Sequence, residues 1–517
     1  MNSARSTFPY KFSIICAIYN TENYISEAVE SIINQDIEFC DSVELILVDD
    51  GSADGSGAIC DSYKEKYPQN IRVIHKPNGG VSSARNVGLN IATGQFINFM
   101  DSDDKLSPNA LSSVYNFFIK NIDEIDFVAI PIYYFEKKTN SHRLNYKFNK
   151  KGNRIIDLQK EYSSIQLHAS SSFFKRECLN KDPFDITMHY AEDAKLIMQL
   201  LLSNPKYGVV SNCHYMYRYR DAMNSALNGS KLKREWYIDS LQKYCLWALN
   251  EAASKYGYIP EYVQYTIMYD LQGRFKVNKI PNFVMSDEDR ILFEKLLFSA
   301  IARIDTHIIL EQRNLSDELK DYIIRTKEGN YTSALEHAQN SSDIILNYNS
   351  KPLVHASKSN FSLSKFDIFD SSVSMTGTLY VYQTFSVPSE IYAAISSKSG
   401  VQNIPCLFEK DFENIFAFDG HPLGTSLKIT LNIPFTLING LTEISIYIVI
   451  DGFTIKLCNI SRAPEFPVVP RQDILNVSDK PYALAITKSK IALEPANRLY
   501  RIKRHLVKKA KVFLSNH

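Results

Sequence analysis

From residue 11 to about residue 135, apolar residues occur in short runs that are separated by longer amphipathic stretches. Runs of strand length cover Phe12–Ile18, Val43–Val48, Ile71–His75 and 95–100, and stretches of helix length lie between the first three. Strands that alternate with helices in this way predict a parallel sheet with crossover helices. We therefore expect an α/β domain with a Rossmann-like sheet that is mixed but mostly parallel.

The remainder of the chain shows two further patterns of residue types. Leu, Tyr, Lys and Glu at helical spacing dominate from about 235 to 345, and alternating β-branched and aromatic runs follow from about 350 to 465. Asp451-Gly452 between two of these runs predicts a tight hairpin. Because 517 residues exceed what one core supports, we predict four parts: an α/β domain at 1–232, a helical connector at 233–348, an immunoglobulin-like β-sandwich for oligomerisation or glycan contact at 349–468, and a tail at 469–517.

Composition indicates the cellular compartment and disfavours one class of partner. The formal net charge of +1 is no global bias toward nucleic acid, so a nucleic-acid partner is not expected. The eight cysteines form no Cys-x-x-Cys pair, which favours reduced thiols in a cytoplasmic protein over disulfides or a zinc site. The first apolar run is only of strand length and is soon followed by Glu22, so neither a secretion signal nor a membrane span is expected.

The segment at 498–514 is strongly basic. It places Leu499, Ile502, Leu506 and Phe513 near one face of a helix and carries no acid among its cations. Such a helix either lies on an anionic membrane or packs, solvated, on its own protein. The uncompensated cations favour the membrane, and they predict a peripheral protein at the inner face of the cell membrane.

Candidate chemistry lies where two of the apolar runs end. Asp101, Asp103 and Asp104 follow the fourth run, and Asp49-Asp50 end the second. Carboxylates this close repel one another, so the expected reason for the first cluster is a bound cation, Mg²⁺ or Mn²⁺. Because open α/β sheets bind ligands at the carboxyl ends of their strands, both clusters predict one crevice. A capped surface turn is the alternative at Asp103.

Two common phosphate-binding loop motifs are absent from the sequence near the first strand. No Gly-x-Gly-x-x-Gly follows it, and no Gly-x-x-x-x-Gly-Lys-Ser/Thr lies close by. Dinucleotide-binding and P-loop functions are therefore disfavoured, although the same alternation of strands and helices serves them.

Four motifs carry a resemblance to a known family. They are residues 15–22 (ICAIYNTE), 48–55 (VDDGSADG), 78–88 (NGGVSSARNVG) and 101–104 (DSDD). In this order and spacing they closely resemble family 2 glycosyltransferases of the GT-A fold, over roughly the first 230 residues. The resemblance implies an inverting transfer from a nucleotide sugar, most often a UDP-sugar, assisted by Mn²⁺ or Mg²⁺.

The resemblance also implies roles for single residues. Asp50 would accept the imide hydrogen of uracil, and a turn-capping role before Gly51 is its alternative. Asp103 would ligate the metal, and Asp101 would contact it or the ribose. The residues that would bind the nucleotide sugar are Ala17, Tyr19, Asn20, Glu22, Asp50, Asn78, Arg85, Asp101, Ser102, Arg218, Arg220 and Ser225.

Glu192-Asp193 resembles the Glu-Asp pair that begins a helix in the same family. Direct displacement needs a carboxylate that takes the proton of the acceptor hydroxyl, and Asp193 is the candidate for this base, with Glu192 orienting its neighbours. The alternative is that both acids only favour the helix N-terminus through its dipole. Relatives often carry a His near the diphosphate loop, but Arg220-Asp221-Ala222-Met223 stand there in this chain, so metal ligation by a His is not expected.

The segment at 265–275 resembles bacterial wall teichoic acid and capsular polysaccharide glycosyltransferases, some of which oligomerise through a C-terminal β-sandwich. This resemblance implies a cell-surface glycan or polymer as acceptor, with lipid-linked oligosaccharide included, and a homo-oligomer. Transfer to a protein-linked glycan is one alternative, and a non-catalytic glycan-binding scaffold of the same fold is the other. The intact acids Asp50, Asp101, Asp103 and Asp193 favour the enzyme.

Overall fold

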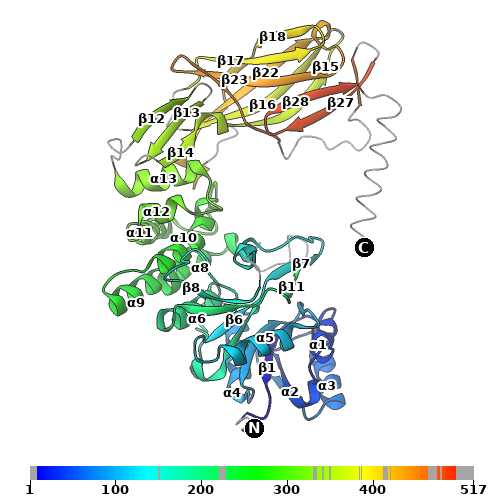
Figure 1. Ribbon diagram of the computed structural model, residues 1–517, viewed down its shortest axis with the longest axis vertical. Coiled ribbons are helices and arrows are strands. Elements are labelled where there is room, and N and C mark those ends of the chain that lie inside the picture. The colour runs from blue at the N-terminus through cyan, green and yellow to red at the C-terminus, as the bar shows by residue number, and fades with distance from the viewer. Residues whose placement is uncertain are drawn as a thin grey trace. The chain divides into compact units, whose positions relative to one another are not determined.

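The computed structural model divides the chain into two compact units (Figure 1). Unit 1 comprises Met1–Arg274 and Ile280–Arg313, and unit 2 comprises Phe275–Lys279 and Asn314–His517. The structure describes residues 8–149, 152–219, 229–329, 335–340, 343–348, 351–382, 385, 387–411, 417–419, 421–463, 474–477 and 480–495.

The main sheet of unit 1 begins with parallel strands, as the sequence predicts. Strand β1 lies between β2 and β4, and β3 extends the sheet beyond β2, all four in parallel. The order continues through β4 to β9, β6, β10 and β8, where β9 and β8 run antiparallel to their neighbours. The strands are β1 Phe12–Ile18, β2 Val43–Asp49, β3 Ile71–His75, β4 Phe96–Asp101, β6 Phe127–Ala129, β8 Arg154–Asp157, β9 Ser172–Lys175 and β10 Lys206–Val209.

Helices cover both faces of this sheet. Side chains of α1, α3 and α5 pack in one buried cluster with Phe12 and Ile14 of β1, whereas α4 approaches the other face at Ile15. This arrangement follows from the crossover connections between parallel strands. The helices are α1 Ile25–Ile33, α2 Phe39–Ser42, α3 Ser56–Lys66, α4 Val81–Ile91, α5 Ala110–Lys120 and α6 Glu192–Ser203, and a short 3₁₀ helix, η1, covers Arg143–Phe148.

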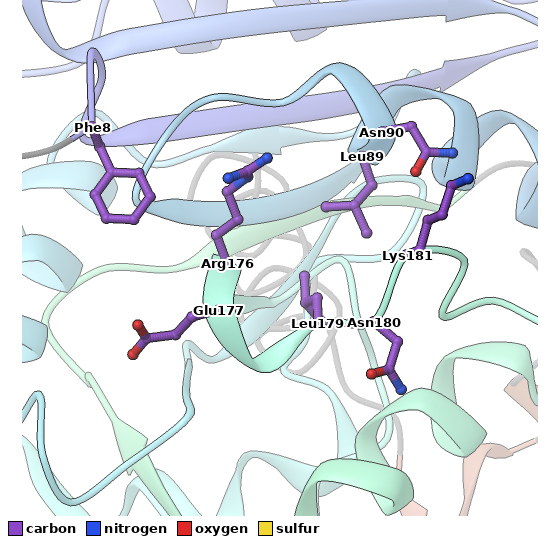
Figure 2. Close-up of a pocket in the computed structure, with 8 residues that line it drawn as sticks. All are labelled: Phe8, Leu89, Asn90, Arg176, Glu177, Leu179, Asn180 and Lys181. Atoms are coloured by element: carbon purple, nitrogen blue, oxygen red, sulfur yellow. The ribbon is translucent and has the colours of Figure 1, made fainter.

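A cavity of about 320 Å³ borders the edge of the sheet where β4 begins (Figure 2). The backbone N–H of Arg176, in its lining, donates to the carbonyl of Gln95, which directly precedes β4. None of its lining residues belongs to the predicted site, which lies at the opposite ends of the parallel strands. The residues that line the cavity are Phe8, Leu89, Asn90, Arg176, Glu177, Leu179, Asn180 and Lys181.

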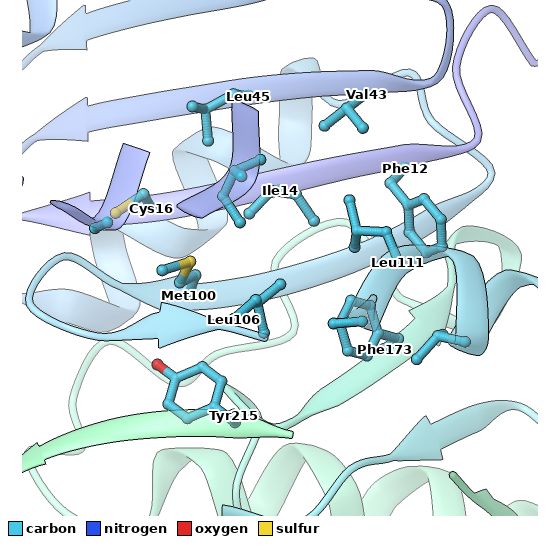
Figure 3. Close-up of a cluster of buried hydrophobic side chains, with 14 of the residues drawn as sticks. Phe12, Ile14, Cys16, Val43, Leu45, Met100, Leu106, Leu111, Phe173 and Tyr215 are labelled. Carbon is cyan, nitrogen blue, oxygen red and sulfur yellow. The ribbon is translucent and has the colours of Figure 1, made fainter. Parts of the chain in front are cut away.

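The core of unit 1 explains why β1 reads as a continuous apolar run. Alternate residues Phe12, Ile14 and Cys16 point into the cluster that Figure 3 shows, together with Met100 of β4 and Tyr215. The intervening residue Ile15 is fully buried on the other face. A strand that is covered on both faces loses the alternation of apolar and polar residues.

The packing between β1 and the turn before β4 leaves no room for a side chain at Gly94. A Cβ there would lie 2.5 Å from both the carbonyl carbon of Phe12 and the nitrogen of Ser13, which are backbone atoms that cannot turn aside. We expect Gly94→Ala to lower the free energy of unfolding by about 1–3 kcal/mol. Urea denaturation measures the change, with Gly229→Ala as the matched control, because a Cβ at Gly229 meets nothing within 4 Å. Equal stability of the two variants would contradict this.

A smaller sheet lies beside the carboxyl end of β4. Strand β11 (Tyr215–Tyr219) pairs with β5 (Lys105–Leu106) on one side and with β7 (Ile132–Glu136) on the other. Since β5 follows the acidic turn at 101–104 directly, this pairing fixes the turn against β11. The smaller sheet therefore brings Arg218 to the candidate metal turn.

The helical region divides between the two units, which differs from the predicted connector. Residues up to Arg313 belong to unit 1 except for Phe275–Lys279, and the last helix belongs to unit 2. The buried guanidinium of Arg274 donates to the Trp236 carbonyl at 3.1 Å and to Ser240 Oγ at 2.6 Å, which holds this region within unit 1. The helices are α8 Arg234–Tyr237, a π-helix at Leu241–Leu246, α9 Trp247–Tyr256, α10 Glu261–Phe275, α11 Asp287–Ile301, α12 Thr306–Leu310 and α13 Asp317–Glu328.

Unit 2 is rich in β-structure, as the alternating pattern predicts. One sheet has the order β19-β22-β16-β15-β25, another β18-β17-β23-β28-β27-β26 with β24 on β23, and a third β12-β13-β14. The strands are β12 Leu335–Asn340, β13 Asp343–Tyr348, β14 Lys351–His355, β15 Asn360–Ile368, β16 Ser372–Tyr382, β17 Glu390–Ser397, β18 Gly400–Pro405, β19 Leu407–Lys410, β20 Ala417–Phe418, β21 His421–Pro422, β22 Gly424–Pro434, β23 Thr442–Ile450, β24 Phe453–Lys456, β25 Asn459–Arg462, β26 Ile474–Val477, β27 Lys480–Thr487 and β28 Lys490–Pro495.

Two sequence predictions meet the structure in this unit. Asp451 and Gly452 have φ of 49° and 82° and join the antiparallel strands β23 and β24, so the predicted hairpin is confirmed. The predicted tail from 469 differs, because β28 pairs with β23 and carries β27 and β26 into the same sheet. The basic segment at 498–514 lies outside the described residues.

Candidate active site

The carboxyl ends of the four parallel strands meet at one edge of the sheet and gather the predicted donor residues there. Tyr19 follows β1 with 53% of its surface exposed, and the exposed Asn78 follows β3. Ala17 lies on β1, in register with Asp101 at the end of β4. The buried Ser102 follows Asp101. The shared direction of the strands therefore brings together motifs that are far apart in the chain.

The loops after β1 and β2 are tied to each other by side chains of the first motif. Asn20, with φ of 52°, accepts from the N–H of Ala53 at 2.8 Å and donates its own N–H to Ser52 Oγ at 3.1 Å. Glu22 accepts from the N–H of Gly55 at 2.7 Å. Asn20 and Glu22 thus hold the shape of this edge, and their contact with a nucleoside stays a prediction.

Asp50 is buried and has its carboxylate occupied by the loop after β3. It accepts from the N–H of Gly79 at 3.0 Å, from the N–H of Gly80 at 2.7 Å and from Lys76 Nζ. Gly80 has φ of 84° and precedes α4, so Asp50 fixes the entry to that helix. The turn-capping alternative does not describe these contacts, because in the turn before Gly51 it is Asp49 that accepts from the N–H of Ser52, at 3.0 Å. The role of Asp50 toward uracil stays a prediction. Sequence reasoning missed Lys76, whose only signal is its place directly after β3.

His75 links the acidic end of β2 to helix α3. Its ring nitrogens lie 2.9 Å from Asp49 Oδ2 and 3.1 Å from Asp61 Oδ1. Hydrogen bonds to Asp49 and then to Asp61 raise the pKa of His75. A raised pKa means that the folded protein holds this proton more tightly than the unfolded chain.

We expect His75→Gln to destabilise the protein most at pH 6 and progressively less as the pH rises toward 8. The reason is that the stabilisation by imidazolium is complete below the unfolded pKa of about 6.5 and is lost as the pH rises through the higher folded pKa. The loss stays at about 1 kcal/mol or less, because nearly half of the His75 side chain, 47%, is exposed. Melting temperatures of both proteins across this pH range measure it, and a constant difference would contradict it.

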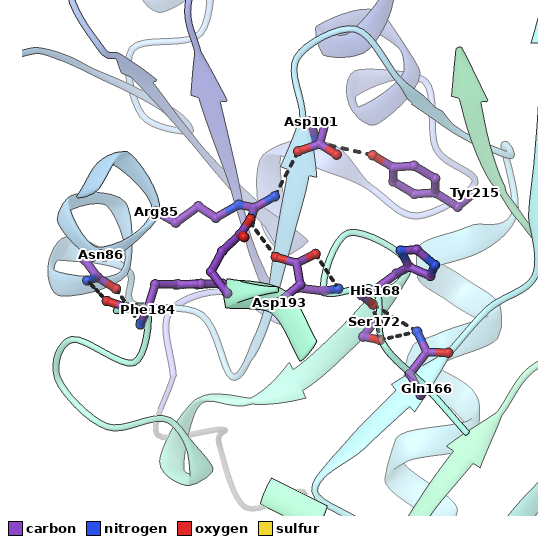
Figure 4. Close-up of polar contacts among 11 residues, drawn as sticks. Arg85, Asn86, Asp101, Gln166, His168, Ser172, Phe184, Asp193 and Tyr215 are labelled. Atoms are coloured by element: carbon purple, nitrogen blue, oxygen red, sulfur yellow. Dashed lines mark hydrogen bonds and ion pairs between the residues drawn. The ribbon is translucent and has the colours of Figure 1, made fainter. Parts of the chain in front are cut away.

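Arg85 joins the first acid of the metal turn to the candidate base (Figure 4). The guanidinium is buried, and it donates to Asp101 Oδ1 at 2.9 Å and to Asp193 Oδ1 at 2.6 Å. Glu192 Oε1 lies 3.6 Å from the same guanidinium. The second oxygen of Asp193 accepts from the N–H of Ala169 at 2.9 Å. The structure thus brings together the acids at 101, 192 and 193 around one cation.

Burial and repulsion by neighbouring carboxylates raise the pKa values of two of these acids, Asp101 and Glu192. Burial raises the pKa of Glu192, with Asp193 as the next cause, and burial likewise raises the pKa of Asp101. Arg85 acts in the opposite direction on both. Carboxyl groups with perturbed pKa values around one buried cation indicate a functional site.

Arg218 is held inside the protein, which differs from a side chain presented to phosphate. It donates from Nε to the Asp103 carbonyl at 2.7 Å, from its second nitrogen to Glu27 at 3.1 Å, and from the third to Glu136. Its backbone N–H donates to Asp104 Oδ1 at 2.7 Å. Arg218 therefore holds the metal turn in place, and direct contact with the diphosphate stays a prediction.

The donor set of the metal turn suits a hard cation. Among the described residues, no group of three or more His, Cys, Asp or Glu side chains is arranged to hold a metal ion. Asp101 and Asp103 are close enough that Asp103 contributes to the raised pKa of Asp101, and their oxygens are the ligands that Mg²⁺ and Mn²⁺ prefer. The chemistry of these two carboxylates therefore fits a hard divalent cation.

Two predicted residues of this site are not described, and one residue that was not predicted contacts Asp101. Arg220 and Ser225 lie outside the described residues. Tyr215 was missed by sequence reasoning, although its hydroxyl accepts from the N–H of Asp101 at 3.2 Å. A tyrosine in a strand gives no signal of such a contact, because the pairing of β11 with β5 creates it.

Comparisons with known proteins agree with this geometry. Residues 13–182 match the model of glycosyl transferase family 2. The minor teichoic acid biosynthesis proteins GgaB and GgaA of Bacillus subtilis (strain 168) are 38% and 35% identical to this chain, over 66% and 63% of its length. These matches cover 38% of GgaB and 73% of GgaA.

A solved structure extends the likeness to the fold. The crystal structure of S. aureus TarS matches with a TM-score of 0.50 at 16% identity, over 95% of this chain and 86% of TarS. At this identity the likeness concerns the fold alone. Because the match to GgaA extends over most of that protein at 35% identity and the family model matches the α/β region, the chain belongs to glycosyl transferase family 2.

Proposed function

We propose that this protein is an inverting, metal-dependent glycosyltransferase that moves a sugar from a UDP-sugar to a hydroxyl of a bacterial cell-surface polymer. One observation carries the proposal: Arg85 couples Asp101 of the metal turn to Asp193 at the same sheet edge. Donor and acceptor chemistry would thus share one site around Arg85. The names of GgaB and GgaA support a teichoic acid as acceptor.

On the donor side, Asp101 and Asp103 would hold Mg²⁺ or Mn²⁺. When bound, the ion supplies positive charge that stabilises the departing diphosphate. The chain itself contributes the exposed Tyr19 and Asn78 beside the loops that Asp50 and Glu22 hold in shape. An aromatic face and an amide at this edge suit the base and ribose of a nucleotide.

On the acceptor side, Asp193 would take the proton of the attacking hydroxyl. The bond between the acceptor oxygen and the anomeric carbon forms as the bond to the diphosphate breaks, and UDP leaves with the electron pair. Arg85 and the N–H of Ala169 each hold one carboxylate oxygen of Asp193 and so fix its orientation. Attack from the face opposite to the leaving group inverts the anomeric centre.

The test uses the full chain with Mn²⁺ or Mg²⁺ and a panel of UDP-, GDP-, CDP- and dTDP-sugars. We expect one UDP-sugar to raise the melting temperature in a metal-dependent way, since a ligand that binds the native state stabilises it. The same donor should then label a purified teichoic acid and not a protein-linked glycan. No shift with any donor would favour the non-catalytic scaffold, and labelling of the protein-linked glycan would replace the acceptor.

Three broader expectations remain parts of this proposal. Cytoplasmic location rests on the eight cysteines that the structure shows unpaired. Attachment to the inner membrane face rests on the basic segment at 498–514, and a homo-oligomer rests on the β-rich unit. Within the described ranges, no helix has both the length and the apolar character needed to cross a membrane.

A further inference from the structure

Lys147 of η1 is a buried cation outside the candidate active site. Only 3% of its surface is exposed, and its ammonium donates to the Ile165 carbonyl at 2.6 Å and to Gln166 Oε1. Both acceptors are neutral. Among the described residues, no carboxylate forms an ion pair with this ammonium.

A buried charge without a counter-ion is costly. Neutral acceptors replace only part of the lost hydration, so such a group either gives up its proton or takes a charged partner. Burial lowers the pKa of Lys147 to about 7. An anion beside it would restore the charge balance.

A cavity of about 350 Å³ within unit 1 offers room for that partner. Lys147 is one of its lining residues, and the others include Tyr146, Arg154, Ser164 and Arg313. Four lysines and arginines line it against two acids, Glu161 and Glu311, and Glu311 accepts from the hydroxyl of Tyr162. The cavity therefore carries a surplus of positive charge.

Arg154 provides a second, independent observation in the same lining. Two of its nitrogens donate to Glu161, at 2.8 Å and 3.0 Å, but its buried Nε–H has no hydrogen-bond partner among the described residues. Buried donors are almost always satisfied in native proteins. Two lining residues of one cavity thus carry an unsatisfied donor and an ammonium without a counter-ion, and both call for an acceptor that carries negative charge.

We propose that this cavity binds a phosphate group, with Lys147, Arg154 and Arg313 as its charged ligands. Phosphate oxygens accept from ammonium and guanidinium donors together, and the hydroxyl of Ser164 adds a neutral donor in the same lining. The group could come as free phosphate or as a phosphodiester of a polymeric acceptor. In the second case the cavity holds a part of the acceptor chain remote from the reacting hydroxyl.

The site would be connected to the candidate base. Gln166, which accepts from Lys147, donates to the carbonyl of His168 at 2.9 Å, and the next residue, Ala169, holds Asp193 through its N–H. A phosphate bound at Lys147 would therefore be linked, through Gln166 and His168, to the Ala169 N–H that orients Asp193. Binding of the polymeric acceptor at this cavity would in this way help to hold Asp193 in position.

The experiment measures the shift in melting temperature of the full chain during titration with inorganic phosphate and, separately, with a glycerol phosphate oligomer. A chelator is present, so that divalent metal at Asp101 and Asp103 does not bind the phosphate. We expect Lys147→Met and Arg313→Met to bind about tenfold or more weakly, since each removes a charged donor. Lys64→Met, which removes an exposed lysine of α3, is the matched control and should bind as the original protein does.

The outcomes separate the possibilities. Equal affinity in all four proteins, or no binding to the original protein, would overturn the proposal. If Lys147→Met does not fold, Arg313→Met decides alone, because Arg313 is exposed and its loss leaves the core intact. Tighter binding of the oligomer identifies the polymer as the source, and binding of inorganic phosphate alone identifies the free ion. No donor sugar is present, so failure here is distinct from failure of the proposed transfer.

Discussion

Replacing Asp193 by asparagine is expected to lower the rate of sugar transfer by roughly 10²–10⁴-fold and to leave UDP-sugar binding largely unchanged. The amide oxygen of the new side chain would still accept from Arg85 or from the N–H of Ala169, so the local fold persists, but it is too weak a base to take the hydroxyl proton. Initial rates of transfer and donor-dependent melting shifts, measured on the same preparation, give the two quantities.

Two further variants make this result specific. Glu192→Gln removes a neighbouring charge of the same sign and should lower transfer less, because Glu192 orients its surroundings in the proposed mechanism. Asp103→Ala should lose the metal-dependent part of donor binding as well as transfer. If Asp193→Asn and Asp103→Ala lose donor binding equally, Asp193 is not the base. If Glu192→Gln shows the larger loss of rate, the base is Glu192, whose raised pKa would suit that role.

The sheet was predictable because its signal is local. Strands β1 and β2 are buried on both faces, so each appears in the sequence as an unbroken apolar run whose limits can be read directly. The turn at Asp451-Gly452 is equally local, since both residues must adopt positive φ. The direction of parallel strands then placed the acidic ends at one edge without any knowledge of contacts.

The pairing of side chains within the site was not predictable in the same way. Arg85 and Asp193 are 108 residues apart in the chain, and their ion pair exists only because the tertiary fold brings the first turn of α6 to α4. The partners of Arg218 were equally hidden from the sequence. Its motif suggests a phosphate ligand, but β11 places it against Glu27 and Glu136, where its hydrogen bonds are internal. Residue type and spacing do not reveal which partners the tertiary fold supplies.

The boundaries of the two units could not be predicted from the sequence pattern either. Helical spacing continues from α8 to α13 without a break, yet the structure assigns α13 to unit 2 and the earlier helices almost entirely to unit 1. Strands β26, β27 and β28 come after a stretch that resembles a tail, and only their pairing with β23 shows that they belong to the sheet. Composition changes more gradually along the chain than do the tertiary contacts that define the two units.

Removing the central cation of the site is expected to destabilise the protein strongly and in a pH-dependent way. Arg85→Met leaves Asp101, Glu192 and Asp193 close together without a counter-charge, and breaking a buried ion pair from one side costs about 3–5 kcal/mol. Urea denaturation at pH 8 and pH 5 measures this loss. A chelator is included because a divalent cation could replace the missing charge.

The direction of the pH dependence follows from the carboxyl groups. Arg85 lowers the pKa of both Asp101 and Glu192, so its removal raises these values further above those of the unfolded chain. A carboxyl with a raised folded pKa favours folding at low pH, and this advantage is lost as the pH rises through that pKa. The deficit of Arg85→Met should therefore be largest at pH 8 and smaller at pH 5. Arg234→Met, which breaks an exposed pair with Asp289, should cost about 1 kcal/mol or less, and adding Asp193→Asn to Arg85→Met should recover stability at pH 8. A deficit that is the same at both pH values would mean that lost packing, and not uncompensated charge, is the cause.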